Sequence, residues 1–232
     1  TGLVTNANSM WLNDKPFKKD LEITLNRKVK LMNDANCFTL SEAVDGAGKD
    51  YQSIFGIIVG TGFGGALSYK KEIIEGANQI AGDWGHQPLP YPTKEEIETK
   101  INCPSMNCGR PLCAEQFMSG IGFKDVFNQK HKTNFTSEEI VKLDLDGDPR
   151  ANSELSLYED RMARLMAVMI GIFDPDAIIL GGGMSNIDRF YINIPTLIPK
   201  YTFSNKVKTK VLKNFHGDSS GVRGAAWLWN NV

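Results

Sequence analysis

Short runs of mainly apolar residues lie at 53–59 and 177–180 of this chain. Short apolar runs rich in β-branched residues are typical of buried strands, so both runs predict strands inside the fold. Lys70 and Lys71 fit the tip of a hairpin that follows the first run. The other strands that the pattern predicts are residues 2–7, 28–32, 66–69, 73–74 and 208–212.

Helical spacing of apolar residues is concentrated in the second half of the chain. Residues 150–173 predict one long helix, which Asp174 and Pro175 end. Residues 136–139 have the form of a capping box before another helix. The remaining helices expected are 20–26, the segment that begins near Asn36, 93–100, 187–198 and 222–229. Strands with intervening helices predict an α/β fold.

The composition is that of a globular protein, with 41% hydrophobic and 23% charged residues. The formal net charge of −1 gives no overall field that would attract nucleic acid or an anionic membrane, so neither partner is expected. The longest apolar run, residues 165–173, is too short to span a bilayer, and the first eleven residues do not resemble a secretory signal. We therefore expect a cytoplasmic protein with reduced thiols.

Three glycine-rich turns follow predicted strands. The first, residues 60–65, leaves backbone N–H groups able to hold phosphate oxygens, although such clusters between two strands are more often tight hairpins. The second, residues 181–183, fits either close approach to a ligand or an ordinary strand-to-helix turn. The third, residues 217–221, leads into a helix whose small residues, beginning at Gly224, favour tight helix packing.

A carboxylate lies between two asparagines in the segment Asn33-Asp34-Ala35-Asn36, where a predicted strand ends and a helix begins. An aspartate in this position is commonly a helix N-cap, and a helix start also favours the ionised carboxylate. The alternative is a general base that takes a proton from an attacking hydroxyl. The residue type and its place fit both roles.

One histidine and three cysteines form a candidate metal site. His86, Cys103, Cys108 and Cys113 provide the four ligands of a closed, structural zinc site, and Gly109 can take the turn between the last two. A histidine alone is more often an ordinary residue, and His131 and His216 are interpreted in that way. The clustered thiols favour zinc for His86.

In their order along the chain, these segments resemble the ROK family (repressors, open reading frames and kinases), and within it the fructokinase/mannokinase branch. Residues 6–13 favour that branch over N-acetylglucosamine kinase. The matching stretches, which together span nearly the whole chain, are residues 33–36, 60–65, 81–86, 108–115, 174–183 and 217–226.

The resemblance implies an actin-like ATPase fold of the ribonuclease-H type, with two lobes around a cleft. Residues 1–44 would be the remainder of a small N-terminal lobe, 45–217 the large lobe with a zinc knuckle, and 218–232 a helix that packs back towards the small lobe. The family's opening strand and Asp-x-Gly-Gly-Thr phosphate loop have no counterpart in the sequence. The N-terminal lobe is therefore expected to be incomplete and the chain alone to be a poor kinase. A homodimer is expected because ROK kinases are commonly dimers.

The resemblance also implies ATP- and Mg²⁺-dependent phosphorylation of a hexose, fructose or mannose preferred, at the 6-hydroxyl. Asp34 would be the catalytic base, and Asn33, Asp83, His86 and Glu115 would bind sugar hydroxyls. His86 would also bind zinc through its other ring nitrogen. The expected ATP-binding residues are Gly60, Thr61, Gly62, Gly64 and Gly65 at the phosphates, and Gly181, Gly182 and Gly183 at the adenosine. The alternative function is the sugar-sensing domain of a ROK transcriptional repressor.

Three positions in the site differ from the family pattern. Asp83 stands where the family usually has glutamate, which shortens the arm of that carboxylate. Met106 stands where the first knuckle cysteine is usual, so Cys103 would have to reach in from a longer loop. Leu112 replaces the usual glycine.

Overall fold

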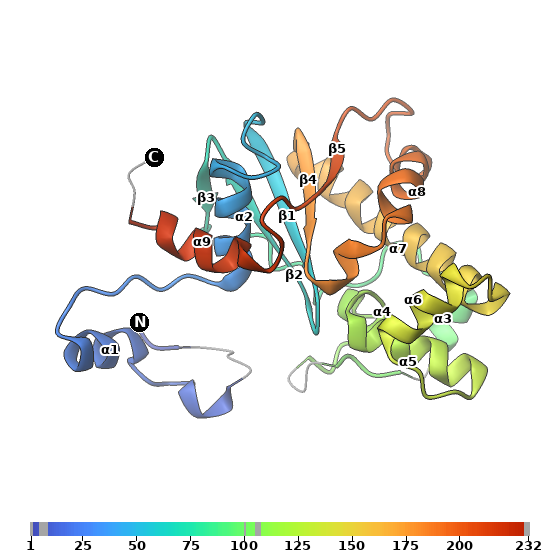
Figure 1. The fold of residues 1–232 in the computed structure, drawn as a ribbon, viewed down its shortest axis with the longest axis horizontal. Coiled ribbons are helices and arrows are strands. Elements are labelled where there is room, and N and C mark those ends of the chain that lie inside the picture. Colours follow the sequence, from blue (N-terminus) through green and yellow to red (C-terminus); the bar gives the residue numbers. More distant parts are fainter. Residues whose placement is uncertain (1, 5–8, 100, 105–107, 230–232) are drawn as a thin grey trace.

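The computed structural model describes residues 2–4, 9–99, 101–104 and 108–229, and a five-stranded sheet forms its centre (Figure 1). The strand order is β3-β2-β1-β4-β5. β1 (Ser53–Val59) pairs antiparallel with β2 (Phe63–Tyr69), which pairs antiparallel with β3 (Glu72–Ile74). On its other side β1 lies parallel to β4 (Ala177–Gly181), and β4 lies parallel to β5 (Lys210–Lys213). The two apolar runs of the sequence are thus neighbouring central strands.

Side chains of β1 alternate between two apolar cores. Ile54 and Ile58 belong to a small core with Phe38, whereas Phe55 and Ile57 belong to the large core that also contains side chains of the long helix. Helices cover both faces of the sheet (Figure 1). This double burial explains why β1 reads as a continuous apolar run and not as an alternation.

The face of the small core carries α2 (Asp34–Val44) and α9 (Ser220–Trp227) (Figure 1). A Cβ atom added to Gly56 in β1 would lie 2.0 Å from Oγ1 of Thr39, and one added to Gly181 would lie 2.3 Å from the Phe38 ring. α2 can therefore approach the sheet closely only because both strands have glycine at these positions.

The far end of α2 is fastened through a buried carboxylate. Glu42 is fully buried, and its oxygens accept hydrogen bonds from the backbone N–H of Ala47, Phe215 and His216 and from the Ser220 hydroxyl, at 2.8–3.2 Å. These four donors satisfy the buried charge without a cation. They also tie α2 to the turn between β5 and α9.

The other face carries the long helix α7 (Pro149–Phe173), which begins at the N-cap Asp148 and ends at Asp174 in a left-handed conformation. The methionines of α7 pack in the large core, where Met162 and Met166 are fully buried. The predicted capping box precedes α6. The remaining helices of this part are α3 (Lys94–Glu98), α4 (Ala114–Met118), α5 (Gly120–His131), α6 (Ser137–Leu145) and α8 (Arg189–Leu197).

The N-terminal arm departs most from the sequence prediction. α1 (Phe17–Leu25) buries none of its residues, and the chain that follows it runs extended to α2 without joining the sheet (Figure 1). The strand predicted at residues 28–32 is wrong, because a strand needs a neighbour to pair its N–H and C=O groups and the described residues form none there. Residues 5–7 of the strand predicted at 2–7 lie outside the described residues, and Gly2–Val4 are not in a strand.

The described part of the chain also contains four short 3₁₀ helices: Met10–Leu12, Gly183–Asn186, Ile198–Lys200 and Gly217–Ser219. Within the described ranges, no helix combines the length and the apolar character that a membrane crossing requires. The division into residues 1–44, 45–217 and 218–232 stays a prediction.

α2 and α9 lie so close together that adding one methyl group to a glycine between them tests their packing. A Cβ atom on Gly224 would lie 1.7 Å from the carbonyl oxygen of Cys37, so we expect Gly224→Ala to lower the free energy of unfolding by about 3 kcal/mol. Gly221 lies in the same helix with nothing within 4 Å of its Cβ position, and Gly221→Ala should raise stability by about 0.5–1 kcal/mol. Urea unfolding of both variants measures the difference, and equal stabilities would contradict the close packing.

Candidate active site and metal centre

The structure separates the roles of Asn33 and Asp34. Asn33 is the N-cap of α2, since its Oδ1 atom accepts hydrogen bonds from the N–H groups of Ala35 at 2.8 Å and Asn36 at 3.3 Å. Asp34 is the first helical residue, is exposed, and accepts only the Ala35 N–H through Oδ1 at 2.9 Å. Its Oδ2 atom receives no hydrogen bond from the described residues. The capping interpretation of Asp34 is therefore wrong, and its carboxylate is open to a ligand at a helix start that favours its ionised form.

The first glycine cluster is a tight hairpin between β1 and β2. The N–H of Gly60 donates to the carbonyl of Gly62 at 3.0 Å, so that donor is used within the turn. Gly64 and Gly65 lie in β2, beyond the turn, and a Cβ atom on Gly65 would meet the Phe55 ring at 2.7 Å. Thr61 and Gly62 are exposed, and within the described part of the chain their N–H groups have no hydrogen-bond acceptor.

The second glycine cluster packs directly on this hairpin. Gly182 has φ +82°, and a Cβ atom there would lie 2.4 Å from the carbonyl oxygen of Val59 at the end of β1. A cavity of about 900 Å³ borders both turns, with Gly60 and Thr61 on one side and Gly183 on the other. The first turns of α5 and α6 complete its wall, through Gly120, Ile121, Thr136, Ser137 and Glu138 among others.

Glu115 lies under the hairpin. It is 8% exposed, its N–H donates to the carbonyl of Gly85 at 2.8 Å, and its Oε2 atom is 3.4 Å from the N–H of Phe63. A Cβ atom on Gly62 would be 3.5 Å from the same oxygen, and one on Gly64 would be 3.9 Å from Cβ of Ala35. The Glu115 carboxylate and the first turn of α2 therefore flank one hairpin.

The segment that carries Asp83 and His86 is pressed against β2. A Cβ atom on Gly85 would lie 1.9 Å from the carbonyl oxygen of Phe63, and the buried Trp84 ring stacks on Phe63 with 5.0 Å between centroids. Trp84 is an anchor that the sequence motif contains but that the sequence analysis did not single out. Asp83 is exposed.

The four candidate metal ligands meet at one point. His86 Nδ1 is 3.5 Å from Sγ of Cys113 and 4.0 Å from Sγ of Cys103, and the sulfurs of Cys108 and Cys113 are 3.5 Å apart. All four ligand atoms lie within 4.8 Å of one another. Donor atoms around a tetrahedral zinc ion are about 3.5–3.8 Å apart, so this set fits zinc with little adjustment.

Cys103 reaches this cluster as expected, whereas Met106 lies outside the described residues. Gly109 has φ +56° and takes the turn expected of it. Leu112 has φ +53°, the left-handed conformation that favours glycine, so its replacement of the usual glycine strains the backbone by about 1–2 kcal/mol.

The surroundings of the cysteine thiols shift their pKa values in different directions. Burial raises the pKa of Cys113 and also that of Cys37, where the charge of Asp34 adds to the effect. Partial burial acts in the same direction on Cys108, but hydrogen bonds from the backbone N–H of Arg110 and from Cys113 and Cys103 outweigh it and lower its pKa. Cys108 is therefore the readiest of these three thiols to ionise.

The comparisons with known proteins agree with this fold. The sequence model of the ROK family matches residues 1–232. The N-acetyl-D-glucosamine kinase of Vibrio atlanticus is 38% identical over 214 residues, which are 92% of this chain and 71% of that protein. The ROK hexokinase of Thermus thermophilus superposes with a TM-score of 0.82 at 24% identity, over 97% of this chain and 72% of that one. A ROK family glucokinase from Streptomyces griseus, solved with glucose and AMPPNP, superposes with a TM-score of 0.79 at 23% identity, over 94% of this chain and 73% of that one.

The sheet order, the helices on both faces and these superpositions show an α/β protein with the actin-like ATPase fold, as predicted. The chain belongs to the ROK family. Its assignment to the fructokinase/mannokinase branch stays a prediction without support from these relatives, since the kinases of Vibrio atlanticus and Vibrio cholerae that it matches are N-acetyl-D-glucosamine kinases. That assignment rested on residues 6–13, of which 6–8 lie outside the described part of the chain.

The unequal thiols lead to a prediction for the chelator-treated protein. Because the thiolate is the reacting form, iodoacetamide near neutral pH should modify Cys108 before Cys113 and Cys37. Peptide mass spectrometry over a time course measures the order, with urea-unfolded protein as the control in which the three rates converge. Modification of Cys113 or Cys37 first would contradict the arrangement of the cluster.

Proposed function

We propose that the protein is a hexose kinase that transfers the γ-phosphoryl group of ATP to N-acetylglucosamine. The observation that carries this proposal is the 38% identity, over 92% of the chain, to an N-acetyl-D-glucosamine kinase. The open carboxylate of Asp34, the cavity beside two glycine turns and the buried Glu115 supply the groups that this reaction needs. The sugar-sensing alternative is less supported, since these relatives are enzymes.

Asp34 would act as the base. The 6-hydroxyl oxygen of the sugar attacks the γ-phosphorus, its proton passes to the Asp34 carboxylate, and the bond from phosphorus to the ADP oxygen breaks. Phosphoryl transfer depends mainly on alignment and charge stabilisation, and one fixed carboxylate is enough for the proton. Asn33 uses its Oδ1 atom as the helix cap, so only its Nδ2 amide group remains to donate to a neighbouring sugar hydroxyl.

The nucleotide would occupy the cavity of about 900 Å³, with the adenosine near Gly183 and the phosphates near Thr61. The N–H groups of Thr61 and Gly62 can donate to phosphate oxygens, whereas that of Gly60 is taken by Gly62. Gly65 would act through the shape of β2, because a Cβ atom there would meet the Phe55 ring at 2.7 Å, whereas one on Gly64 would make only ordinary contact with Ala35 at 3.9 Å. A bound Mg²⁺ ion would supply charge neutralisation at the transferring phosphoryl group.

The sugar would bind between the first turn of α2 and Glu115, which flank the same hairpin. Glu115 keeps its carboxylate under the hairpin and can accept from sugar hydroxyls. His86 would bind zinc through Nδ1, the ring atom that faces the thiols, and would turn Nε2 to the sugar. Asp83 is exposed and free to join them. Zinc would then act structurally, by fixing the tautomer and orientation of His86. The homodimer and the cytoplasmic location stay predictions.

Asp34→Asn is the direct test of the base. It keeps the shape of the side chain and removes the proton acceptor, so we expect kcat on N-acetylglucosamine to fall by about 10²–10⁴-fold. Asp20→Asn is the control, since Asp20 is also an exposed acid in the first turn of a helix, α1. A coupled ADP-release assay on the full-length gene product measures both variants. Equal rates in the two would show that Asp34 is not the base.

The same assay tests the substrate. We expect kcat/KM for N-acetylglucosamine to exceed the values for glucose, fructose and mannose by at least about tenfold. An equal or higher value for any of these sugars would contradict the proposed substrate while leaving the kinase activity intact.

Metal analysis tests the zinc site. We expect one zinc ion per chain in the freshly purified protein and loss of most of it in Cys103→Ser, because three ligands hold zinc far more weakly than four. Cys37→Ser is the matched control, as Cys37 is a buried thiol that lies outside the cluster. Inductively coupled plasma mass spectrometry gives the stoichiometry. A Cys103→Ser protein that keeps its zinc would exclude Cys103 as a ligand.

A further inference from the structure

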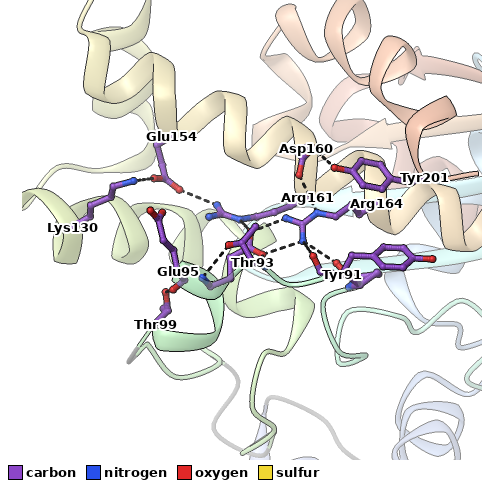
Figure 2. A network of polar contacts seen from close by, with 12 residues as sticks. Tyr91, Thr93, Glu95, Thr99, Lys130, Glu154, Asp160, Arg161, Arg164 and Tyr201 are labelled. Carbon is purple, nitrogen blue, oxygen red and sulfur yellow. Dashed lines mark hydrogen bonds and ion pairs between the residues drawn. The ribbon is translucent and has the colours of Figure 1, made fainter.

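Four charged side chains meet in the interior between α3 and α7 (Figure 2). They are Glu96 of α3 and Glu154, Arg161 and Arg164 of α7, and each has at most 4% of its side chain exposed. Arg161 bridges the two acids, with Nε 2.8 Å from Glu96 and Nη1 2.9 Å from Glu154. Two positive and two negative charges cancel, which allows the cluster to be buried.

Arg164 holds a loop as well as a carboxylate. Its Nη1 atom donates to the carbonyl oxygens of Pro90 at 2.9 Å and Tyr91 at 2.8 Å, and its Nη1 and Nη2 atoms donate to Glu96 at 3.0 and 2.7 Å (Figure 2). Glu96 in turn accepts the N–H of Thr93 at 2.8 Å in the capping box of α3. Glu96 and Arg164 together therefore fasten the segment from Pro90 to α3 onto the long helix.

These bonds keep Glu96 charged. Burial alone would raise the pKa of its carboxyl, but hydrogen bonds from Arg164, the Thr93 N–H and Arg161 outweigh burial and lower that pKa to about 2. The ionised Glu96 carboxylate thus contributes its full stabilisation of the fold at pH values above the ordinary pKa of a glutamate. This stabilisation is lost as the pH falls through about 2. The ion pairs of Glu96 with Arg161 and Arg164 are therefore intact at any pH at which the protein would work.

The anchored segment connects two of the proposed zinc ligands. His86 precedes Pro90 by four residues, and Cys103 follows Glu96 by seven. On its other side the segment is paired with the stretch that carries Cys113, through hydrogen bonds from Leu89 N–H to Leu112 at 2.7 Å and from Ala114 N–H to Gln87 at 2.8 Å. This pairing fixes His86 relative to Cys113, but it does not extend to Cys103.

Cys103 stands three residues before the position where the family pattern has its cysteine. In the sequence, Cys103 follows α3 by five residues, and the place of α3 on α7 is set by Glu96 and Arg164. The planar guanidinium group of Arg164 binds a carboxylate and two carbonyl oxygens, so it fixes both the distance and the orientation of α3 relative to α7. An apolar contact between the two helices would fix them less specifically.

We propose that Glu96 and Arg164 are positioning residues for the metal site: they fix the start of the segment that carries Cys103, so that its thiol can take the fourth ligand position. The inference rests on the proposed zinc site. It assigns to the buried ion pairs a role that core stability alone does not require, since buried ion pairs contribute little net stability relative to apolar packing.

The test compares zinc affinity in three variants of the full-length protein. Arg164→Lys keeps the positive charge but loses the fork that binds Pro90, Tyr91 and Glu96, and Glu96→Gln removes the carboxylate. Glu159→Gln is the matched control, because Glu159 is an equally buried acid of α7 whose partner, Arg189 at 2.6 Å, lies on α8. Competition with a chromogenic chelator gives the dissociation constant, and thermal unfolding of each zinc-free variant reports general damage.

We expect zinc to bind about tenfold more weakly in Arg164→Lys and Glu96→Gln and with unchanged affinity in Glu159→Gln. Hydrogen exchange of residues 87–99 should be faster in Arg164→Lys than in Glu159→Gln with zinc bound. Unchanged affinity and exchange in all three variants would overturn the positioning role while leaving the zinc site in place. A parent protein that binds no zinc would overturn the zinc site and this inference together. If Glu96→Gln does not fold, Arg164→Lys alone decides.

Discussion

The close seating of α2 on the sheet is the constraint on which the candidate site depends. Gly56 and Gly181 leave room for Thr39 and Phe38, and Gly224 lets α9 touch the backbone of α2 at Cys37. Glu42 then ties the far end of the helix to the turn after β5. With the helix held on two sides and at its end, its first residue, Asp34, projects at a fixed place beside the β1–β2 hairpin.

That hairpin joins the other parts of the site. The start of α2 lies against Gly64, Glu115 lies under Gly62 and Phe63, and Gly182 of the second glycine turn touches Val59. Residues from three other stretches of the sequence thus meet around one turn. The Asp34 end of α2, the buried Glu115 and the cavity thus border one hairpin, as the proposed phosphoryl transfer requires.

The sequence predicted what depends on strong local patterns. β1 and β4 were found within a residue because their apolar runs are continuous, and α7 because its helical period is long. The four candidate metal ligands could be grouped because histidine and clustered cysteines have few other uses. Residues 28–32 carry an equally plausible strand pattern, yet they form none because no neighbour pairs with them. Asn33, and not Asp34, caps α2, a choice between adjacent residues that composition does not settle. The contact of Arg164 with Glu96 joins residues 68 apart and leaves no local signature.

The central claim is that the carboxylate of Asp34 faces the hydroxyl that receives the phosphoryl group. A crystal structure with N-acetylglucosamine and a non-hydrolysable ATP analogue tests it most directly. If Asp34 is the base, the 6-hydroxyl oxygen will lie within about 2.6–3.2 Å of an Asp34 carboxylate oxygen, with the γ-phosphate on the opposite side of that hydroxyl. A sugar bound with its 6-hydroxyl directed away from Asp34, or a nucleotide outside the cavity beside Gly183, would contradict it.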